Sequence, residues 1–181
     1  TNIIHSISGK MPDNGLITQR PFVAPHHSCS MPAMVGGGAK SKPGEISLAH
    51  NGVLFLDELA EFPRPVLESL RQPIENGKIT VSRAQAHVDY PADFQLIAAM
   101  NPCRCGYLSD RERECGRAPK CGQDYQAKIS GPLLDRMDII INVIPIDIFA
   151  DHSEETTECS TIVKKRVIAA REIQKQRYQN Y

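Results

Sequence analysis

The stretch Gly52-Val53-Leu54-Phe55-Leu56-Asp57-Glu58 decides the fold that this sequence predicts. Four consecutive apolar residues after a glycine predict a short strand buried on both faces, as in a parallel sheet. Asp57 and Glu58 would then emerge at the carboxyl edge of the sheet, where open α/β folds bind ligands. In a nucleotide hydrolase, Asp57 would help to hold Mg²⁺ and Glu58 would polarise the attacking water. A buried strand that ends in an ordinary polar turn explains this one segment equally well.

Two further apolar runs favour the same sheet. Phe94–Met100 ends on Asn101, and Ile139–Ile144 follows Arg136. Three near-continuous apolar strands with helices between them predict an α/β fold with a parallel sheet covered on both faces. The polar side chains gather where these strands begin or end. That clustering favours a nucleotide site over a structural turn.

The other local signals predict helices and hairpins. A helix should follow the first predicted strand and bend at Pro73, and another should occupy 161–181, where apolar residues recur at helical spacing. The segments 28–35 and 44–49, around a glycine cluster, are expected to be extended parts of a hairpin or long loop. Residues 78–90 predict a hairpin with a basic tip, and most such hairpins have no function beyond structure.

Composition limits the class of protein. The 181 residues have a formal net charge of zero, so no global field attracts nucleic acid or an anionic membrane. There is no apolar run long enough to cross a bilayer and no signal-peptide pattern, which predicts a cytoplasmic protein without a membrane partner. His26 and His27 have no carboxylate or thiol beside them in the sequence, which favours a structural or DNA-facing role over metal binding.

Six cysteines without a secretion signal favour reduced thiols or a metal over disulfides. Cys103, Cys105, Cys115 and Cys121 fall together in the segment 102–124, and four thiolates suit tetrahedral Zn²⁺. Their spacing, C-x-C-x9-C-x5-C, is not the common paired C-x2-C form. A loop of free or oxidised cysteines is therefore an equal alternative to a zinc site.

A series of short strings throughout the chain carries a resemblance to a known family. The strings are Pro25-His26-His27-Ser28, Gly36-Gly37-Gly38, Pro43-Gly44-Glu45-Ile46-Ser47-Leu48-Ala49-His50, Gly52–Glu58, Glu61-Phe62, Leu70-Arg71-Gln72-Pro73-Ile74-Glu75, Ala99-Met100-Asn101-Pro102-Cys103, Gly131–Asp138, Arg166-Val167 and Ala169-Ala170-Arg171-Glu172-Ile173-Gln174. Together they resemble the ComM-like group of Mg-chelatase-like AAA+ ATPases, in the helix-2-insert clade. This group is related to magnesium chelatase subunit I and to the minichromosome maintenance helicases. The resemblance covers most of the chain.

The resemblance implies roles for four residues. Asp57 and Glu58 are similar to the Walker B pair, and Asn101 is similar to sensor 1, whose amide orients the attacking water. Arg136 is similar to the arginine finger, which in this clade reaches the nucleotide of a neighbouring subunit and offsets charge on the transferred phosphoryl group. The implied cofactors are ATP and Mg²⁺.

The resemblance also bears on less specific residues. Arg136 has a structural alternative, an ion pair with Asp135 or Asp138. The predicted hairpin resembles the presensor 1 hairpin, so Arg83 and Gln85 would face DNA in a central channel. In the family the second pair of cysteines is closer together than in this sequence, which sets Cys121 apart from the other expected zinc ligands.

The resemblance further implies parts that this sequence lacks, namely a phosphate-binding loop upstream and a sensor 2 arginine downstream. We expect an internal fragment that cannot turn over ATP alone. Residues 1–150 would form a partial AAA+ core, a three-layer sandwich with hairpin insertions, and 151–181 a connector and the first helix of a helical lid. The family's strand order, 5-1-4-3-2, leaves two edges open. The strands at 94–100 and 139–144 should therefore pair directly, or the chain should dimerise.

The leading functional hypothesis is part of a hexameric AAA+ ATPase motor that remodels branched or single-stranded DNA in natural transformation and recombination. A magnesium-chelatase motor subunit would carry the same ATPase motifs, but the cysteine segment and the strings at Pro25–Ser28 and Pro102–Cys105 favour the first reading. A zinc-stabilised DNA-binding module using Arg83 and the basic C-terminal helix is the non-enzyme alternative. Zero net charge and the absence of aromatic residues among the basic ones weigh against it.

Overall fold

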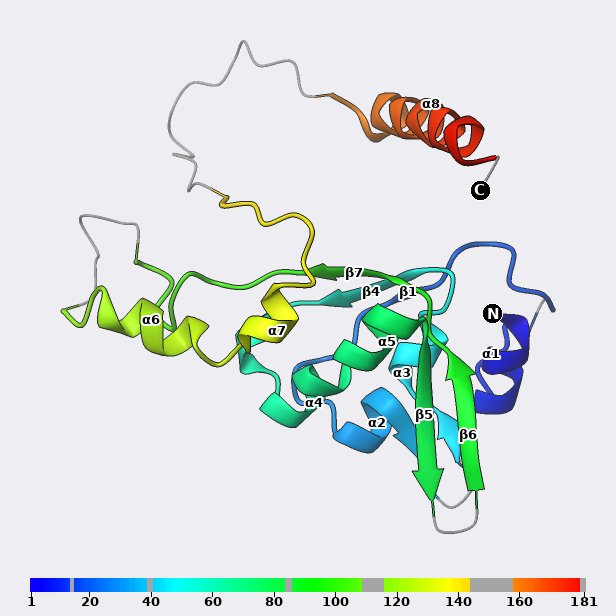
Figure 1. Cartoon of the computed structure of the whole chain (residues 1–181), viewed down its shortest axis with the longest axis horizontal. Helices are drawn as coiled ribbons and strands as arrows, with labels where there is room; N and C mark the ends of the chain where they lie inside the picture. The colour runs from blue at the N-terminus through cyan, green and yellow to red at the C-terminus, as the bar shows by residue number, and fades with distance from the viewer. Residues whose placement is uncertain (14, 39–40, 84–85, 109–115, 144–157, 180–181) are drawn as a thin grey trace. The chain divides into compact units, whose positions relative to one another are not determined.

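The computed structural model describes residues 1–13, 15–38, 41–83, 86–108, 116–143 and 158–179 (Figure 1). The chain forms two compact units, Thr1–Ile140 and Ile141–Tyr181. The first unit contains the sheet and its covering helices. The second contains α8 (Ser160–Tyr178), which confirms the helix predicted at the C-terminal end.

The first unit is built on a parallel sheet whose strands are β1 (Phe22–Val23), β4 (Val53–Leu56) and β7 (Gln95–Ala98), in the order β1-β4-β7. Val53 pairs with Phe22 on one side and with Gln95 on the other, and Leu56 pairs with Ala98. The predicted α/β fold with a parallel sheet is confirmed, and β4 and β7 lie within the predicted apolar runs. β1 is only two residues long and was not predicted.

The helices of this unit, including one 3₁₀ turn (η1), are α1 (Asn2–Ser8), α2 (Met31–Val35), α3 (Glu45–Leu48), η1 (Leu59–Glu61), α4 (Arg64–Ser69), α5 (Arg71–Asn76), α6 (Lys120–Gln126) and α7 (Gly131–Leu134). Two antiparallel hairpins join β2 (Gly36–Gly37) to β3 (Lys42–Pro43) and β5 (Lys78–Arg83) to β6 (Ala86–Pro91). The second of these confirms the hairpin predicted over residues 78–90.

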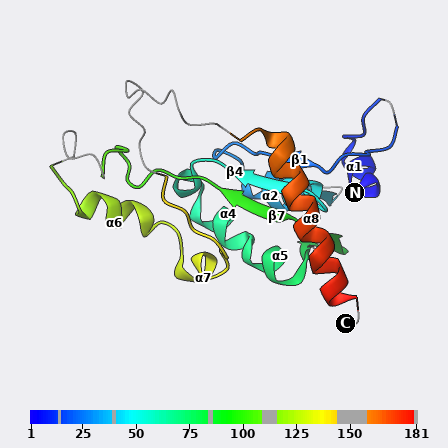
Figure 2. The same cartoon turned by 90° about the horizontal axis from the view of Figure 1, so that it is seen from above.

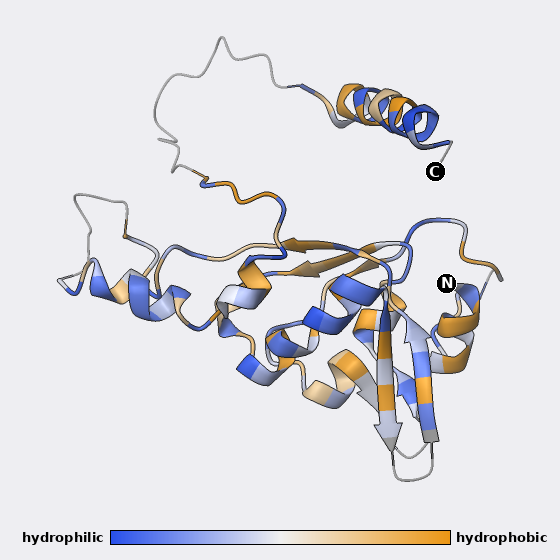
Figure 3. Cartoon of the chain, in the orientation of Figure 1, coloured by the Kyte–Doolittle hydropathy of each residue, from blue (hydrophilic) through white to orange (hydrophobic). Residues whose placement is uncertain are grey.

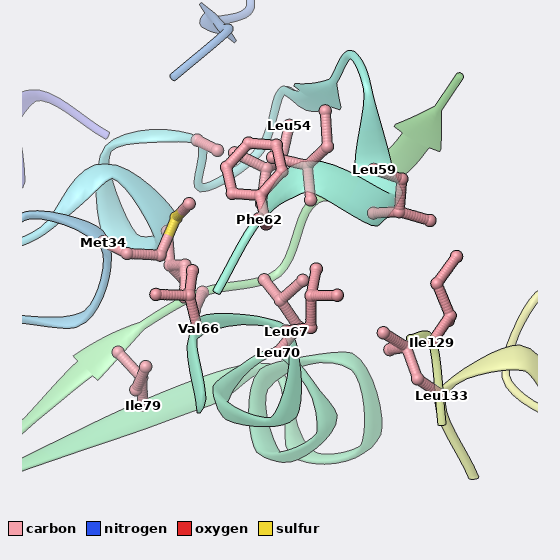
Figure 4. Packing of buried hydrophobic residues seen from close by; sticks show 14 of the residues in the cluster. Met34, Leu54, Leu59, Phe62, Val66, Leu67, Leu70, Ile79, Ile129 and Leu133 are labelled. Atoms are coloured by element: carbon pink, nitrogen blue, oxygen red, sulfur yellow. The ribbon is translucent and has the colours of Figure 1, made fainter. Parts of the chain in front are cut away.

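The core lies between one face of the sheet and the helices α2 to α5 (Figures 1 and 2). Leu54 and Leu56 of β4 are fully buried, and they belong to the same cluster as Val66, Leu67 and Leu70 of the α4–α5 segment. Figure 4 shows these helical side chains pointing toward Leu54 and Phe62. β4 and the part of β7 after Gln95 are hydrophobic, whereas α4 and α5 carry hydrophilic residues on their outer surface (Figure 3).

The opposite face of the sheet is exposed in the described residues. Phe22 and Ile97 are 67% and 42% exposed, and Phe22 stacks on Phe55 with ring centroids 5.9 Å apart. The burial of β4 therefore alternates along the strand, with Leu54 and Leu56 inward.

The helix after β4 is divided, as its proline predicts. α4 ends at Ser69 and α5 begins at Arg71, with Leu70 between them, and Gly77 ends α5 at a φ of 63°. The break comes one turn before Pro73, because a proline nitrogen has no hydrogen to donate to the carbonyl of Ser69. A glycine takes the left-handed conformation at this helix end without the steric cost that a side chain brings.

The expectation of extended segments at 28–35 and 44–49 was wrong, because both contain a short helix. Ser30 caps α2, and its Oγ accepts a hydrogen bond of 3.4 Å from the N–H of Ala33. Met34 of α2 and Ile46 of α3 are both fully buried and belong to the same core cluster. Capping and burial together outweigh the loop-like composition around the glycines. Among the described residues around the glycine cluster, 36–37 and 42–43 pair as strands.

The expected third strand at 139–144 was also wrong over its described part. Residues 139–143 form no strand, and Ile139, Ile140 and Ile141 are 79%, 71% and 75% exposed. A strand needs a neighbour to complete its backbone hydrogen bonds, and no described strand pairs with this segment. The expected direct pairing of 94–100 with 139–144 is therefore not seen between the described residues, whose sheet ends at β7.

No described helix combines the length and the apolar character that crossing a bilayer would require. α8 is the longest of these helices, and it has no buried residue within its own unit. Its apolar side chains include Val167, Ile168 and Ile173, each more than half exposed.

Candidate functional site

The turn after β4 places two carboxylates at the carboxyl edge of the sheet. Asp57 and Glu58 are both exposed, and Asp57 Oδ1 accepts a hydrogen bond of 2.8 Å from the N–H of Glu58. Glu58 has a φ of 52°, in the left-handed region, and η1 begins directly after it. That conformation costs a side-chain-bearing residue about 1–3 kcal/mol, and such strained residues concentrate at functional sites. The backbone therefore turns sharply at Asp57 and Glu58.

The segment after β7 runs beside this turn and brings Asn101 to the same edge. The N–H of Ala99 donates to the carbonyl of Leu56 over 2.9 Å, and the carbonyl of Ala99 accepts from the N–H of Leu59, also over 2.9 Å. Asn101 follows two residues later and is exposed. Carboxylate oxygens suit Mg²⁺, and an amide can orient a water molecule by a hydrogen bond. The parallel register therefore gathers the three predicted residues from two strands.

His27 is a member of this edge that the sequence reasoning missed. Its Nδ1 lies 2.8 Å from Glu58 Oε2, and its ring packs edge-on against Phe62 and tilted against His26. The expectation that His27 has no carboxylate beside it was thus wrong in space, although it holds in sequence. His27 follows β1, which is parallel to β4, so both strands deliver their next residues to one edge. The apolar pair before Pro25 was the available signal, but a two-residue strand is too short to recognise by pattern.

Arg136 lies elsewhere. Its guanidinium forms an ion pair with Glu75 through Nη2 and donates from Nη1 to the carbonyl of Pro132. Its Nε is buried without a hydrogen-bond partner among the described residues. The structural alternative predicted an ion pair for Arg136, but with Asp135 or Asp138, so the kind of contact is right and the partner is different.

The surroundings of Arg136 are at the other end of β7. Arg136 and Glu75 line a cavity of about 470 Å³ together with Gln95 and Leu96, the first residues of β7. Asn101 is six residues beyond Gln95, which corresponds to roughly 20 Å of extended chain. Arg136 is therefore not brought together with Asp57 and Glu58 within one chain.

A cluster of thiols follows Asn101 closely. The Sγ atoms of Cys103, Cys105 and Cys121 all lie within 4.8 Å of one another, and those of Cys103 and Cys105 are 3.2 Å apart. A disulfide bond would require about 2.05 Å. Cys121, the predicted ligand that the family resemblance set apart, is thus a member of the cluster, whereas Cys115 lies outside the described residues.

The helix that carries Cys121 is fastened to the turn after Glu58. Tyr125 of α6 is buried, and burial together with a hydrogen bond to the Glu61 carboxylate raises the pKa of Tyr125 to about 12. Lys128 lies 3.4 Å from Glu61 Oε2 and 4.9 Å from the centroid of the Tyr125 ring. Desolvation acts to raise the pKa of Glu61, but the hydrogen bonds from Tyr125 and Lys128 outweigh it and lower that pKa. The cysteine segment and the acidic turn therefore share one packed structure.

Two predicted DNA contacts, Arg83 and Gln85, stay predictions. The side chain of Arg83 and the whole of Gln85 lie outside the described residues, although the backbone of Arg83 closes β5 opposite Ala86.

Comparisons with known proteins identify the relatives of this chain. The YifB protein of Salmonella typhimurium is 53% identical over 161 residues, which cover 88% of this chain and 31% of that protein. The competence protein ComM of Haemophilus influenzae is 51% identical over 163 residues, again 88% of this chain and 31% of that protein. The magnesium-chelatase 67 kDa subunit of Chlorobaculum parvum is 28% identical over 104 residues, 58% of this chain and 13% of that protein. The chain thus spans about a third of the length of the first two relatives.

Among solved structures, NtrX from Brucella abortus in complex with ADP resembles 66% of this chain and 24% of its own, with 18% identity and a TM-score of 0.45. The family model described as magnesium chelatase, subunit ChlI, matches residues 1–149, which is most of the chain. This match and the high identity to the ComM and YifB proteins agree with the resemblance derived from the sequence, and the chain belongs to the family of the magnesium chelatase subunit ChlI.

Proposed function

We propose that this chain is part of a Mg²⁺-dependent AAA+ ATPase that couples ATP hydrolysis to the remodelling of branched DNA. The observation that carries the proposal is the meeting of Asp57, Glu58 and Asn101 at one edge of the parallel sheet. Family membership and the 51% identity to a competence protein support it. Natural transformation and recombination in the cytoplasm are the setting in which we expect it to act.

Each residue of the edge has a proposed role. Asp57 uses Oδ1 to accept from the Glu58 backbone, and a hard carboxylate oxygen of this kind fits a magnesium ligand near the phosphates. Glu58 would polarise the attacking water, and the amide of Asn101 would hold that water in line. Mg²⁺ would neutralise charge that develops between the β- and γ-phosphate oxygens.

Arg136 is proposed to act on a neighbouring subunit. Within its own chain it pairs with Glu75 beside the amino end of β7, well away from Asp57. A guanidinium that is to offset charge on the phosphoryl group must therefore meet a nucleotide held by a second copy. A hexamer, as in the family, would supply that copy, and a dimer is the simplest assembly expected of the isolated chain.

We assign turnover to a longer protein that contains this chain. The sequence holds no G-x-x-x-x-G-K-[ST] loop, which supplies the lysine and backbone amides that cradle phosphates. The 181-residue chain alone is therefore expected to be inactive. Arg83 and Gln85 remain proposed DNA contacts of the longer protein.

A magnesium-chelatase motor subunit is the second candidate, favoured by the 28% identity to the chelatase 67 kDa subunit. It would use the same edge of the sheet for ATP hydrolysis but would respond to a porphyrin-binding partner instead of DNA. The much higher identity to ComM favours the first candidate.

The test is the ATPase rate of the longer protein with and without a branched DNA substrate. We expect turnover that DNA stimulates and that Glu58→Gln abolishes. Glu61→Gln is the matched control, because Glu61 is a carboxylate three residues further on that binds Tyr125 and Lys128 instead. ATPase activity that responds only to a porphyrin-binding partner would favour the chelatase. DNA binding without any ATPase would instead favour a zinc-stabilised binding module.

A further inference from the structure

The cysteine cluster has the dimensions of a metal site. In a tetrahedral zinc–thiolate centre, Zn–S bonds of about 2.3 Å place the sulfurs about 3.8 Å apart. The three Sγ atoms of Cys103, Cys105 and Cys121 lie within 4.8 Å of one another, and the Cys103–Cys105 separation is 3.2 Å. The sulfur–sulfur distance of a zinc–thiolate centre lies between these two values. A disulfide would instead join two of the sulfurs and exclude the third.

The backbone is shaped to bring the three thiols together. Gly106 has a φ of 81°, and its N–H donates to the carbonyl of Cys103 over 3.1 Å, which closes a turn that carries Cys105 back beside Cys103. A left-handed φ of this kind suits glycine. Cys121 arrives from α6, where the neighbouring Gly122 packs so closely that an added Cβ would meet Leu108 Cδ2 at 2.5 Å. Gly106 thus suits the turn of the loop, and Gly122 suits the close packing of α6 on Leu108.

The cluster lies directly after Asn101. Cys103 is two residues beyond Asn101 and is fully buried, so its sulfur would bind a metal ion from the interior of the protein. The carbonyl of Pro102, between them, accepts a hydrogen bond of 2.9 Å from Gln126 Nε2 of α6. An ion bound to Cys103 and Cys121 would therefore tie the exit of β7 to α6, which is itself fastened to Glu61 by Tyr125 and Lys128.

We propose that Cys103, Cys105 and Cys121 bind one zinc ion, and that this ion fixes the position of Asn101 relative to the turn of Asp57 and Glu58. The three thiolates are soft ligands that select zinc over magnesium, so the two metals of the protein would occupy separate sites. The three cysteines are positioning residues for Asn101. The binding of zinc stands on the cluster alone, and its effect on ATP hydrolysis rests on the proposed function.

The first experiment measures the metal content of the purified 181-residue chain under reducing conditions. We expect about one zinc per chain, because three converging thiolates bind zinc tightly even when water fills the fourth position. Cys105→Ser should reduce the zinc content at least about fivefold, and because Cys105 is exposed, this change should leave the fold intact. Cys29→Ser and Cys159→Ser are the matched controls, since neither residue belongs to the cluster. A chain that holds no zinc or holds iron, or a zinc content that falls equally in the controls, would overturn the proposal.

A second measurement uses the wild-type chain and so avoids any variant that fails to fold. Replacement of zinc by Co²⁺ should give the intense visible bands of tetrahedral thiolate coordination, and these bands should disappear with a chelator. The weak spectrum of octahedral Co²⁺ would contradict a thiolate site.

The effect on Asn101 can be read without ATPase activity. In a ¹H–¹⁵N spectrum, removal of zinc should shift or broaden the side-chain amide signals of Asn101 and leave those of Asn51 unchanged. Asn51 is the control because it precedes β4 at the opposite edge of the sheet, where its backbone N–H donates to the carbonyl of Asp93. Unchanged Asn101 signals after complete zinc removal would overturn the positioning role. Zinc binding in a protein without ATPase would refute the proposed function and leave the metal site standing.

Discussion

The two ends of β7 carry different chemistry. At the carboxyl end, Asn101 stands beside the exposed turn of Asp57 and Glu58, and these side chains are open to solvent. At the amino end, Arg136 is held by Glu75 in a partly enclosed cavity. The parallel register collects polar residues at one edge of the sheet, whereas the arginine predicted to serve the same reaction stands at the other edge. A common site would need two copies of the chain.

The largest expected effect tests whether the two ends work together across a subunit boundary. In the longer protein, Arg136→Ala should reduce the ATPase rate by roughly 10³-fold, the range in which an arginine finger acts. Mixing this variant with Glu58→Gln should restore part of the rate, because each nucleotide site would take Glu58 from one subunit and Arg136 from the next. The measurement is the steady-state ATPase rate of the mixture, compared with the rate of each variant alone.

Arg71→Ala provides the control for this mixing experiment. Arg71 also pairs with a glutamate, Glu68, at 3.3 Å on the α4–α5 segment, so its loss removes a similar ion pair. A mixture as inactive as its two components would contradict the assignment of Arg136 to a neighbouring site.

The next effect concerns the carboxyl end alone. Glu58→Gln should lower kcat by about 10²–10⁴-fold, because an amide cannot take up the water's proton in the transition state. Nucleotide affinity should be nearly unchanged, since Mg²⁺ binding is assigned to Asp57. Titration with a fluorescent ATP analogue separates the two quantities, and a variant that loses both binding and turnover equally would argue against a role for Glu58 at the water.

A third prediction compares two apolar segments that look alike in the sequence. Leu56→Ala in β4 should lower the free energy of unfolding by about 2–5 kcal/mol, because Leu56 is fully buried. Ile139→Ala should change it by less than about 0.5 kcal/mol, because Ile139 is 79% exposed. Urea unfolding of the 181-residue chain measures both. Equal losses would mean that the segment after Arg136 is buried in solution.

The same pair shows how far the sequence predicts this fold. The runs around β4 and β7 become strands because each finds the other as a hydrogen-bonded neighbour. The run after Arg136 is equally apolar, but a strand exists only with a partner, and single-sequence patterns do not say which segment lies alongside. The short helices α2 and α3 were missed for a related reason, since Met34 and Ile46 favour them only through burial in the finished core.

For the site, local and distant contacts differ in the same way. Asp57 and Glu58 could be predicted because they are adjacent and end an apolar run. The contacts of His27 with Glu58 and of Glu75 with Arg136 join segments far apart in the chain, and no spacing rule reveals them. The cysteines are an intermediate case, because the sequence predicted a cluster that includes Cys121, and the fold brings Cys121 to Cys103 and Cys105.

A smaller effect tests the neighbour of Glu58 that the sequence did not reveal. His27→Ala should lower kcat by roughly tenfold with little change in KM, because a lost hydrogen bond to a charged group is worth about 1.5–3 kcal/mol, only part of which bears on orientation. His27→Gln retains a donor that can reach Glu58 and should recover much of the rate. Equal losses in the two variants would show that packing against Phe62, and not the contact with Glu58, is what matters.

The smallest effect concerns the link between α6 and the acidic turn. Burial, together with the hydrogen bond to Glu61, raises the pKa of Tyr125 from 10.0 to about 12, so the folded chain holds this proton more tightly than the unfolded chain does. The resulting stabilisation is complete below pH 10 and declines as the pH rises from about 10 through about 12. Tyr125→Phe should cost about 1 kcal/mol of stability at neutral pH through the lost hydrogen bond, and its stability should fall less steeply than that of the wild type in the alkaline range. Tyr107→Phe is the control, because Tyr107 is 42% exposed. If the stability of the wild type and of Tyr125→Phe falls in parallel at alkaline pH, α6 is held to the turn by packing alone. The cysteine cluster would then be linked to Glu58 only through the segment that contains Asn101.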